Sequence, residues 1–185
     1  MSHRRTEKKN KLKIRGARSE DRDAARKITL SAFQQYAAVM PPPRWEGYRE
    51  NILATLTDVA PAQQIVAEKE GLILGSVLLY PLGTAFSTPH EGPLTCPEVR
   101  LLAVAPEARG QGIGTALMKE CIRRARRLGA ICLNLHTTDM MQVAMRMYEQ
   151  MGFVRDPELD FHPDPSITVK AYRLELDCVG IAKEG

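Results

Sequence analysis

The spacing of hydrophobic side chains changes near the middle of the chain, from every second residue to a helical repeat. This change predicts a strand followed by a helix. Residues 99–104 have apolar side chains on alternate positions, which favours a largely buried strand that ends at Pro106. From Ile113 to Leu128 the apolar positions recur with helical spacing, and basic residues take the opposite face. Gly129 stands where a left-handed cap would end this helix.

The same two periods predict further elements on both sides of this segment. Strands are expected over residues 12–18, 64–67, 72–82, 131–136, 153–155 and 168–176, and helices over 19–36, 45–56 and 140–151. The prolines at 41–43 are expected to exclude a helix, and residues 83–97 are expected to be a loop because they contain several Gly and Pro residues. Residues 157–165 are expected to be a loop between the last two strands.

Length and composition favour one domain. A chain of 185 residues that is 44% hydrophobic can bury one core, which we place at residues 12–178 after a disordered basic tail at residues 1–11. No apolar run reaches the length of a membrane span, and the N-terminus lacks a signal-peptide core, so a cytoplasmic location is expected. A content of 5% aromatics without basic and aromatic interleaving argues against nucleic-acid binding, although the basic tail keeps that hypothesis open.

The four cysteines are widely scattered along the chain. Cys96, Cys121, Cys132 and Cys178 form no Cys-x-x-Cys pair, and no histidine stands at zinc-binding spacing. We therefore expect reduced structural thiols and no metal site.

Between the predicted strand and helix, glycines at 110, 112 and 114 favour an anion site. The first N–H groups of a helix have no partners within it, and glycines let a phosphate approach the main chain closely. The dinucleotide fingerprint fails because its third glycine position holds Thr115, and the nucleotide P-loop fails because no Gly-Lys-Ser/Thr triplet follows. A tight turn without a ligand is the alternative.

Two motifs resemble those of the GNAT family of N-acetyltransferases. Arg109-x-x-Gly112-x-Gly114, directly after Leu-Ala-Val-x-Pro, resembles the family's acetyl-CoA pyrophosphate loop, and Tyr148-Glu149-Gln150-Met151-Gly152-Phe153 resembles its Tyr-Glu-x-x-Gly-Phe signature. The resemblance covers residues 12–176. It implies an α/β fold with a central mixed sheet of about seven strands and about four flanking helices, and acetyl-CoA as the co-substrate.

The resemblance also implies roles for particular residues. Tyr148 would protonate the departing thiolate, the alternative being a core aromatic, and Glu98 would be the general base, with a pKa raised by burial. The alternative for Glu98 is a structural pair with Arg100, and His136 and His90 are lesser candidates for the base. Met141 stands where many relatives have an Asn that contacts the cofactor. The residues expected to bind the cofactor are Leu102, Ala103, Val104, Arg109, Gly110, Gln111, Gly112, Ile113, Gly114 and Thr115.

By this resemblance the chain is expected to transfer an acetyl group directly from acetyl-CoA to an amine on a small molecule or peptide. The alternative is an acyl-CoA-binding sensor or regulatory module without catalysis. Neither a membrane nor a nucleic acid is expected as a partner, and a homodimer follows only by analogy with the family.

Overall fold

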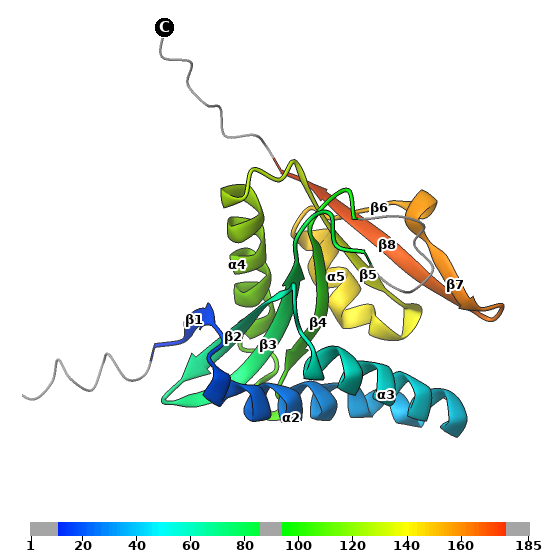
Figure 1. Cartoon of the computed structure of the whole chain (residues 1–185). Coiled ribbons are helices and arrows are strands. Elements are labelled where there is room, and N and C mark those ends of the chain that lie inside the picture. Colours follow the sequence, from blue (N-terminus) through cyan, green and yellow to red (C-terminus); the bar gives the residue numbers. More distant parts are fainter. Residues whose placement is uncertain (1–10, 86–93, 177–185) are drawn as a thin grey trace, which may run out of the picture. The chain divides into compact units, whose positions relative to one another are not determined.

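The structure, a computed structural model, describes residues 11–85 and 94–176. Residues 1–10 of the predicted tail, His90 and Cys178 therefore lie outside the described residues. The strands are β1 (Lys13–Gly16), β2 (Gln63–Lys69), β3 (Leu72–Tyr80), β4 (Glu98–Val104), β5 (Cys132–Thr137), β6 (Val154–Arg155), β7 (Phe161–Asp164) and β8 (Ile167–Glu175). The α-helices are α2 (Arg22–Phe33), α3 (Pro42–Thr57), α4 (Ile113–Arg127) and α5 (Gln142–Gln150), and five short 3-10 helices connect them: η1 (Ser19–Asp21), η2 (Gln34–Ala38), η3 (Pro106–Ala108), η4 (Asp139–Met141) and η5 (Pro157–Leu159) (Figure 1).

The predicted α/β fold with a mixed sheet is confirmed. The hydrogen-bonded strand order is β1-β2-β3-β4-β5-β8-β6, and β7 also pairs with β8. β4 and β5 run parallel, whereas β1 with β2, β2 with β3 and β5 with β8 are antiparallel.

Two predictions about individual elements are wrong. β7 lies inside the predicted 157–165 loop, where Pro163 interrupts the alternating pattern. A proline is tolerated because, among the described strands, β7 pairs with β8 alone, and does so irregularly. α3 begins at Pro42 rather than at Trp45, because a proline's fixed φ and missing N–H suit the first turn of a helix.

The described chain forms two compact units, which are treated separately. The first contains the residues up to Leu79 together with Leu101–Glu120, and the second contains Tyr80–Arg100 and the residues from Cys121 onward. Among the described residues, no helix combines the length and the apolar composition needed to cross a bilayer.

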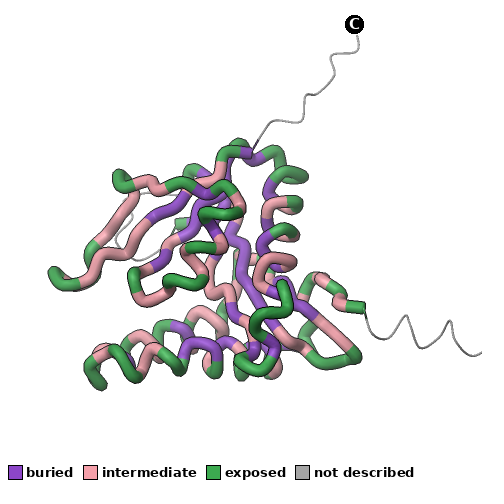
Figure 2. The backbone as a smooth tube through the Cα atoms, turned by 180° about the vertical axis from the view of Figure 1, so that it is seen from behind, coloured by how far each residue is buried: buried purple, intermediate pink, exposed green. Residues whose placement is uncertain are grey.

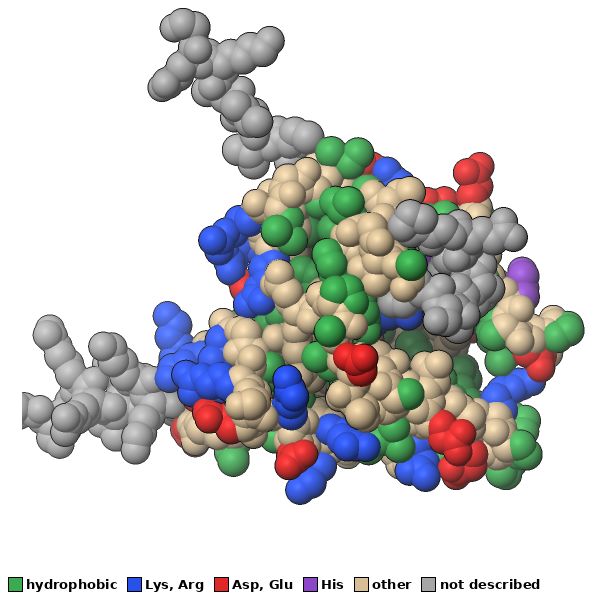
Figure 3. Space-filling model, viewed as in Figure 1, with side chains coloured by type: hydrophobic (Ala, Val, Ile, Leu, Met, Phe, Trp, Pro, Cys, Tyr) green, Lys and Arg blue, Asp and Glu red, His purple; other side chains and the backbone are tan. Residues whose placement is uncertain are grey.

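The first unit joins the antiparallel strands β1 to β3 with α2 and α3. The rings of Phe33 on α2 and Tyr48 on α3 lie 6.0 Å apart, which fixes the two helices against each other. Their outer faces carry interspersed acidic and basic side chains (Figure 3), as is usual for a solvated surface. Gly75 on β3 allows close packing: a Cβ there would stand 3.0 Å from both the Ala103 carbonyl oxygen and Leu117 Cδ1.

The second unit is built around β5. Its neighbour β8 pairs with it from Cys132 opposite Glu175 to Thr137 opposite Lys170, and Leu133 and Leu135 on β5 are fully buried. Buried residues follow the strands, whereas exposed residues follow the loops and outer helix turns (Figure 2). This unit presents the beginning of β4 beside β5, which is where Glu98 lies.

Candidate active site

The loop between β4 and α4 has a backbone that only glycine adopts without strain. Gly110 and Gly112 have φ angles of 73° and 74°, and a Cβ at either position would meet no atom within 4 Å. α4 begins at Ile113, and the Ala116 N–H donates to the Gly112 carbonyl oxygen at 2.9 Å. The loop is therefore a tight turn with open space beside its main chain.

This geometry suits a phosphate. The first N–H groups of α4 have no acceptor within the helix, and the positive end of the helix dipole lies in the same place. Gly110, Gln111 and Gly112 are exposed, so their backbone groups are accessible. The chemistry of these donors and the space at the glycines fit the diphosphate of a nucleotide cofactor.

The Arg109 side chain forms hydrogen bonds within the first unit, to which Arg109 belongs. Its Nη2 donates to the Ala32 carbonyl oxygen at 3.0 Å, and its Nη1 lies 3.4 Å from Gln35 Oε1. The guanidinium thus ties the loop to the end of α2. Its expected contact with the cofactor remains a prediction.

β4 changes its backbone conformation in the middle of the strand. Leu101 has a φ of 49°, which is rare for a residue with a side chain and costs about 1 kcal/mol or more. The register of β4 on β5 covers Glu98 opposite Asn134 and Val99 opposite Leu135. The irregularity therefore falls just before Leu102, Ala103 and Val104, the residues expected to offer their main chain to a cofactor.

Among the described residues of the second unit, Glu98 has the most buried carboxylate. The residue is 1% exposed, its Oε1 accepts from Arg100 Nε at 2.6 Å, and His136 Nδ1 lies 3.5 Å from the same oxygen. Arg100 in turn lies over the Tyr80 ring, 5.6 Å from its centroid.

The expectation that the pKa of Glu98 lies above its ordinary value is wrong. Burial does raise the pKa of this carboxyl, but the contacts with His136 and Arg100 lower it by more, so that the net pKa lies below the usual range. Glu98 is therefore ionised at neutral pH. The pairing with Arg100, which was the structural alternative, is present.

Asn134 was missed at the level of sequence. It is 4% exposed and stands opposite Glu98 in the parallel register, and among the described residues its buried Oδ1 has no hydrogen-bond partner. Such an atom calls for an explanation, because buried polar groups are nearly always satisfied. Only the knowledge that β4 and β5 are neighbours in this register would have identified it.

Tyr148 lies on α5 in the second unit. The residue is 7% exposed, and its ring centroid is 5.9 Å from that of Phe153, so its ring is part of the core as well as a candidate for chemistry. Met141 closes η4 directly before α5 and is partly exposed.

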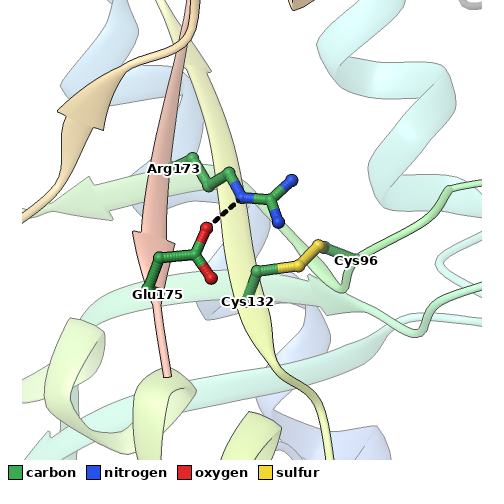
Figure 4. Close-up of a disulfide and its surroundings, with 4 residues drawn as sticks. All are labelled: Cys96, Cys132, Arg173 and Glu175. Carbon is green, nitrogen blue, oxygen red and sulfur yellow. Dashed lines mark hydrogen bonds and ion pairs between the residues drawn. A yellow bond between two sulfur atoms is a disulfide. The ribbon is translucent and has the colours of Figure 1, made fainter. Parts of the chain in front are cut away.

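The prediction of reduced thiols is wrong for two of the four cysteines. Cys96 and Cys132 form a disulfide, with Cα atoms 5.6 Å apart, and Arg173 and Glu175 of β8 lie beside it (Figure 4). Cys96 is two residues before Glu98 and Cys132 two residues before Asn134, so the parallel register brings the sulfurs together. Cys121 is buried and remains outside the disulfide.

Within residues 11–85 and 94–176, no group of three or more His, Cys, Asp or Glu side chains is arranged to hold a metal ion. The candidates for chemistry in this part of the chain are the glycine loop, the buried carboxylate of Glu98 and the Tyr148 side chain.

Comparisons with known proteins agree with this arrangement. The chain is 32% identical over 112 residues to an uncharacterized N-acetyltransferase of Schizosaccharomyces pombe, a match that covers 60% of this chain and 62% of that protein. The chain spans between 25% and 62% of the lengths of the curated relatives that it matches.

Solved structures share the fold at low sequence identity. The ribosomal-protein-S18-alanine N-acetyltransferase of Escherichia coli superposes with a TM-score of 0.64 and 18% identity, covering 93% of this chain and 98% of that one. The yncA protein of Salmonella typhimurium, solved with its cofactor acetyl-CoA, gives a TM-score of 0.59 at 18% identity, covering 91% and 95%.

A match to a protein-family model assigns the chain to a family as well as to a fold. The model described as "Acetyltransferase (GNAT) family" matches residues 25–153, a span that includes β4, the glycine loop, α4 and Tyr148. The loop, the interrupted strand and the matched sequence all lie in this span, and the chain belongs to the acetyltransferase (GNAT) family.

Proposed function

We propose that this chain is an N-acetyltransferase that transfers the acetyl group of acetyl-CoA directly to an amine on a small molecule or peptide. The observation that carries the proposal is the loop at Gly110 and Gly112, whose left-handed backbone and open space suit a diphosphate at the start of α4. Membership of the family supports acetyl-CoA as the co-substrate, as does the acetyl-CoA in the yncA structure.

In this proposal each part of the site has one task. Bound acetyl-CoA supplies an electrophilic thioester carbon, to which the amine nitrogen bonds as the bond from carbon to sulfur breaks. The main chain of Leu102, Ala103 and Val104 aligns the cofactor arm, and residues 109–115 hold the diphosphate. Glu98 accepts the proton that the amine loses, and Tyr148 donates one to the departing sulfur.

The position of the Glu98 contacts agrees with this role. Arg100 and His136 both approach Oε1. We assign Oε2 to the proton, because a carboxylate oxygen that already has two positively polarised neighbours is the poorer acceptor.

Several broader features remain proposals. Residues 12–178 would form one acetyltransferase domain, located in the cytoplasm and associated as a homodimer. The disulfide argues against the cytoplasmic part of this proposal, because such bonds are rare in reducing compartments. A non-catalytic acyl-CoA-binding module is the alternative function, and it predicts tight CoA binding without turnover on a broad amine panel.

The function is tested by measuring CoA binding and thiol release with the wild-type protein and a Gly112→Ala variant. The new Cβ would enter the space assigned to the diphosphate, so CoA affinity is expected to fall about tenfold, the loss expected for one or two main-chain hydrogen bonds. Gly71→Ala is the matched control: Gly71 has a φ of 82° and open space too, but lies in the turn between β2 and β3. Equal CoA affinity in both variants would contradict the loop assignment, and no thiol release with any amine would leave only the binding module.

Tyr148→Phe is expected to lower kcat about tenfold while leaving the affinity for acetyl-CoA unchanged. The effect is modest for an acid catalyst because a thiol has a pKa of about 8.5, so the thiolate departs readily and water replaces part of the proton donation. Steady-state kinetics with monitored thiol release measures it. An unchanged kcat would leave Tyr148 as a core aromatic, which its contact with Phe153 already explains.

A further inference from the structure

His136 connects Glu98 to a second segment of the same unit. It lies on β5 two residues after Asn134, and its ring is within 3.5 Å of Glu98 Oε1 through Nδ1 and within 3.1 Å of the Leu159 carbonyl oxygen through Nε2. A carbonyl oxygen only accepts, so Nε2 carries the proton of the second contact. In the imidazolium form both nitrogens carry protons, and the ring then satisfies the carbonyl and the carboxylate together.

The segment that receives Nε2 is itself firmly held. The Leu159 N–H donates to the Asp156 carbonyl oxygen at 3.1 Å, and the next residue, Asp160, accepts two hydrogen bonds from Arg155 at 2.8 and 2.6 Å. Asp160 Oδ1 also accepts the N–H of Ala171 on β8 at 2.8 Å. These hydrogen bonds hold the Leu159 carbonyl oxygen in a defined position.

Packing fixes the plane of the imidazole. The Phe161 ring meets it edge to face, with centroids 5.4 Å apart, and the His136 side chain is 11% exposed. A ring held by stacking and by a hydrogen bond on one nitrogen has one orientation for the other nitrogen. That nitrogen faces the carboxylate of Glu98.

We propose that His136 is a positioning residue for Glu98: anchored on the Leu159 carbonyl, its ring fixes the buried carboxylate in the orientation that accepts the proton of the amine. This inference rests on the proposed function for the role of Glu98. It also removes His136 from the candidates for the general base, because each ring nitrogen already faces an oxygen of the protein.

The electrostatics of the carboxylate agree with the geometry. Within the described part of the chain, the charged and titratable groups in contact with Glu98 are Arg100 from its own strand and His136 from β5, and the Arg100 guanidinium lies over the Tyr80 ring. Burial raises the pKa of Glu98, and His136 and Arg100 lower it below the usual range. Removing the His136 contact is therefore expected to raise the pKa of Glu98, so that the carboxylate is protonated at a higher pH.

Three substitutions separate the two contacts of the ring. His136→Phe keeps the ring and its packing but removes both nitrogens, His136→Asn keeps a donor near the position of Nδ1, and His136→Gln keeps one near the position of Nε2. His162→Phe is the matched control, because His162 is exposed on β7 and contacts the Ile167 carbonyl oxygen and Thr168 instead.

His136→Phe is expected to lower kcat about tenfold, as for the loss of one charge-assisted contact, with the KM for acetyl-CoA unchanged. The acid limb of its kcat/KM profile should move to higher pH. His136→Asn should restore part of both effects, whereas His136→Gln should not, and His162→Phe should behave as wild type. If Gln restores activity as well as Asn, or if Phe leaves the pH profile unchanged, the ring only anchors the Leu159 segment and the proposal is wrong.

A direct titration keeps the test independent of turnover. NMR of the Glu98 side-chain carboxyl carbon gives its pKa in the wild type and in His136→Phe, and thermal unfolding shows that each variant is folded. A higher pKa in the variant supports the proposal even if no acceptor is found, and an equal pKa overturns it. A protein without turnover but with this pKa shift would contradict the proposed function alone.

Discussion

Replacing Glu98 with glutamine is expected to lower kcat by about 100- to 10,000-fold, the range that a general base contributes. Glutamine has the size of the carboxylate, and its oxygen can still accept from Arg100, so the substitution removes the proton acceptor with little change in packing. The affinity for CoA should stay within about twofold, or about 0.4 kcal/mol, because Glu98 is not among the residues assigned to the cofactor. Steady-state kinetics and CoA binding measure the two effects.

The chain offers a closely matched control for this substitution. On β8, Arg173 Nε donates to Glu175 Oε1 at 2.6 Å, which repeats the pairing of Arg100 with Glu98 two residues apart on a strand. The Glu175 side chain is 70% exposed, whereas that of Glu98 is 2% exposed. Glu175→Gln should therefore leave kcat unchanged, and a loss of activity in both variants would point to general destabilisation.

The pH dependence follows from the lowered pKa of Glu98. Because the folded pKa lies below that of an ordinary glutamate, near 4.3, the base stays ionised as the pH falls to that value. The contribution of its ion pairs to stability is present above the unfolded pKa and is lost as the pH falls through the folded one. An acid limb of kcat near pH 6 or 7, removed in Glu98→Gln, would show that bound substrates reverse this shift, because kcat reports the pKa values of the enzyme–substrate complex.

The sequence predicted the segment from Glu98 to α4 well because its local signals agree. A short apolar strand, a proline, exposed glycines and a long amphipathic helix each favour the same boundaries, and the structure has them at Val104, Pro106 and Ile113. β7 was missed because an edge strand with one neighbour tolerates a sequence without alternation.

The rest of the site depends on contacts between distant residues. Burial raises the pKa of Glu98, whereas contacts with Arg100 and with His136, which is 38 positions further along the chain, lower it. The sequence does not show which of these opposing effects is larger. Likewise, Arg109 reads as a cofactor ligand from its motif, yet its guanidinium bonds the Ala32 carbonyl oxygen, 77 positions away. Patterns in the sequence identify which residues matter, whereas the register between strands decides what each one touches.

The disulfide is the clearest case of a contact that depends on register, and removing it is expected to lower the free energy of unfolding by about 2–4 kcal/mol. The cysteines are 36 positions apart, so the bond closes a long loop and restricts the unfolded chain. It also joins the starts of β4 and β5 beside Glu98 and Asn134, where the parallel register covers only two positions. The crosslink thus strengthens the junction between β4 and β5 beside Glu98, the proposed general base.

Denaturant unfolding of the wild-type protein with and without a thiol reductant measures this contribution, and a double variant, Cys96→Ala with Cys132→Ala, separates the bond from side effects of the reductant. The oxidised wild type should unfold at higher denaturant than the reduced protein, whereas the double variant should be insensitive to reductant. Cys121→Ala controls for the loss of a buried sulfur without a crosslink, since Cys121 lies outside the disulfide. If alkylation of the native protein labels Cys96 and Cys132, or if the reductant does not shift the wild-type transition, the bond contributes nothing to stability. The parallel register alone would then hold Glu98 against β5.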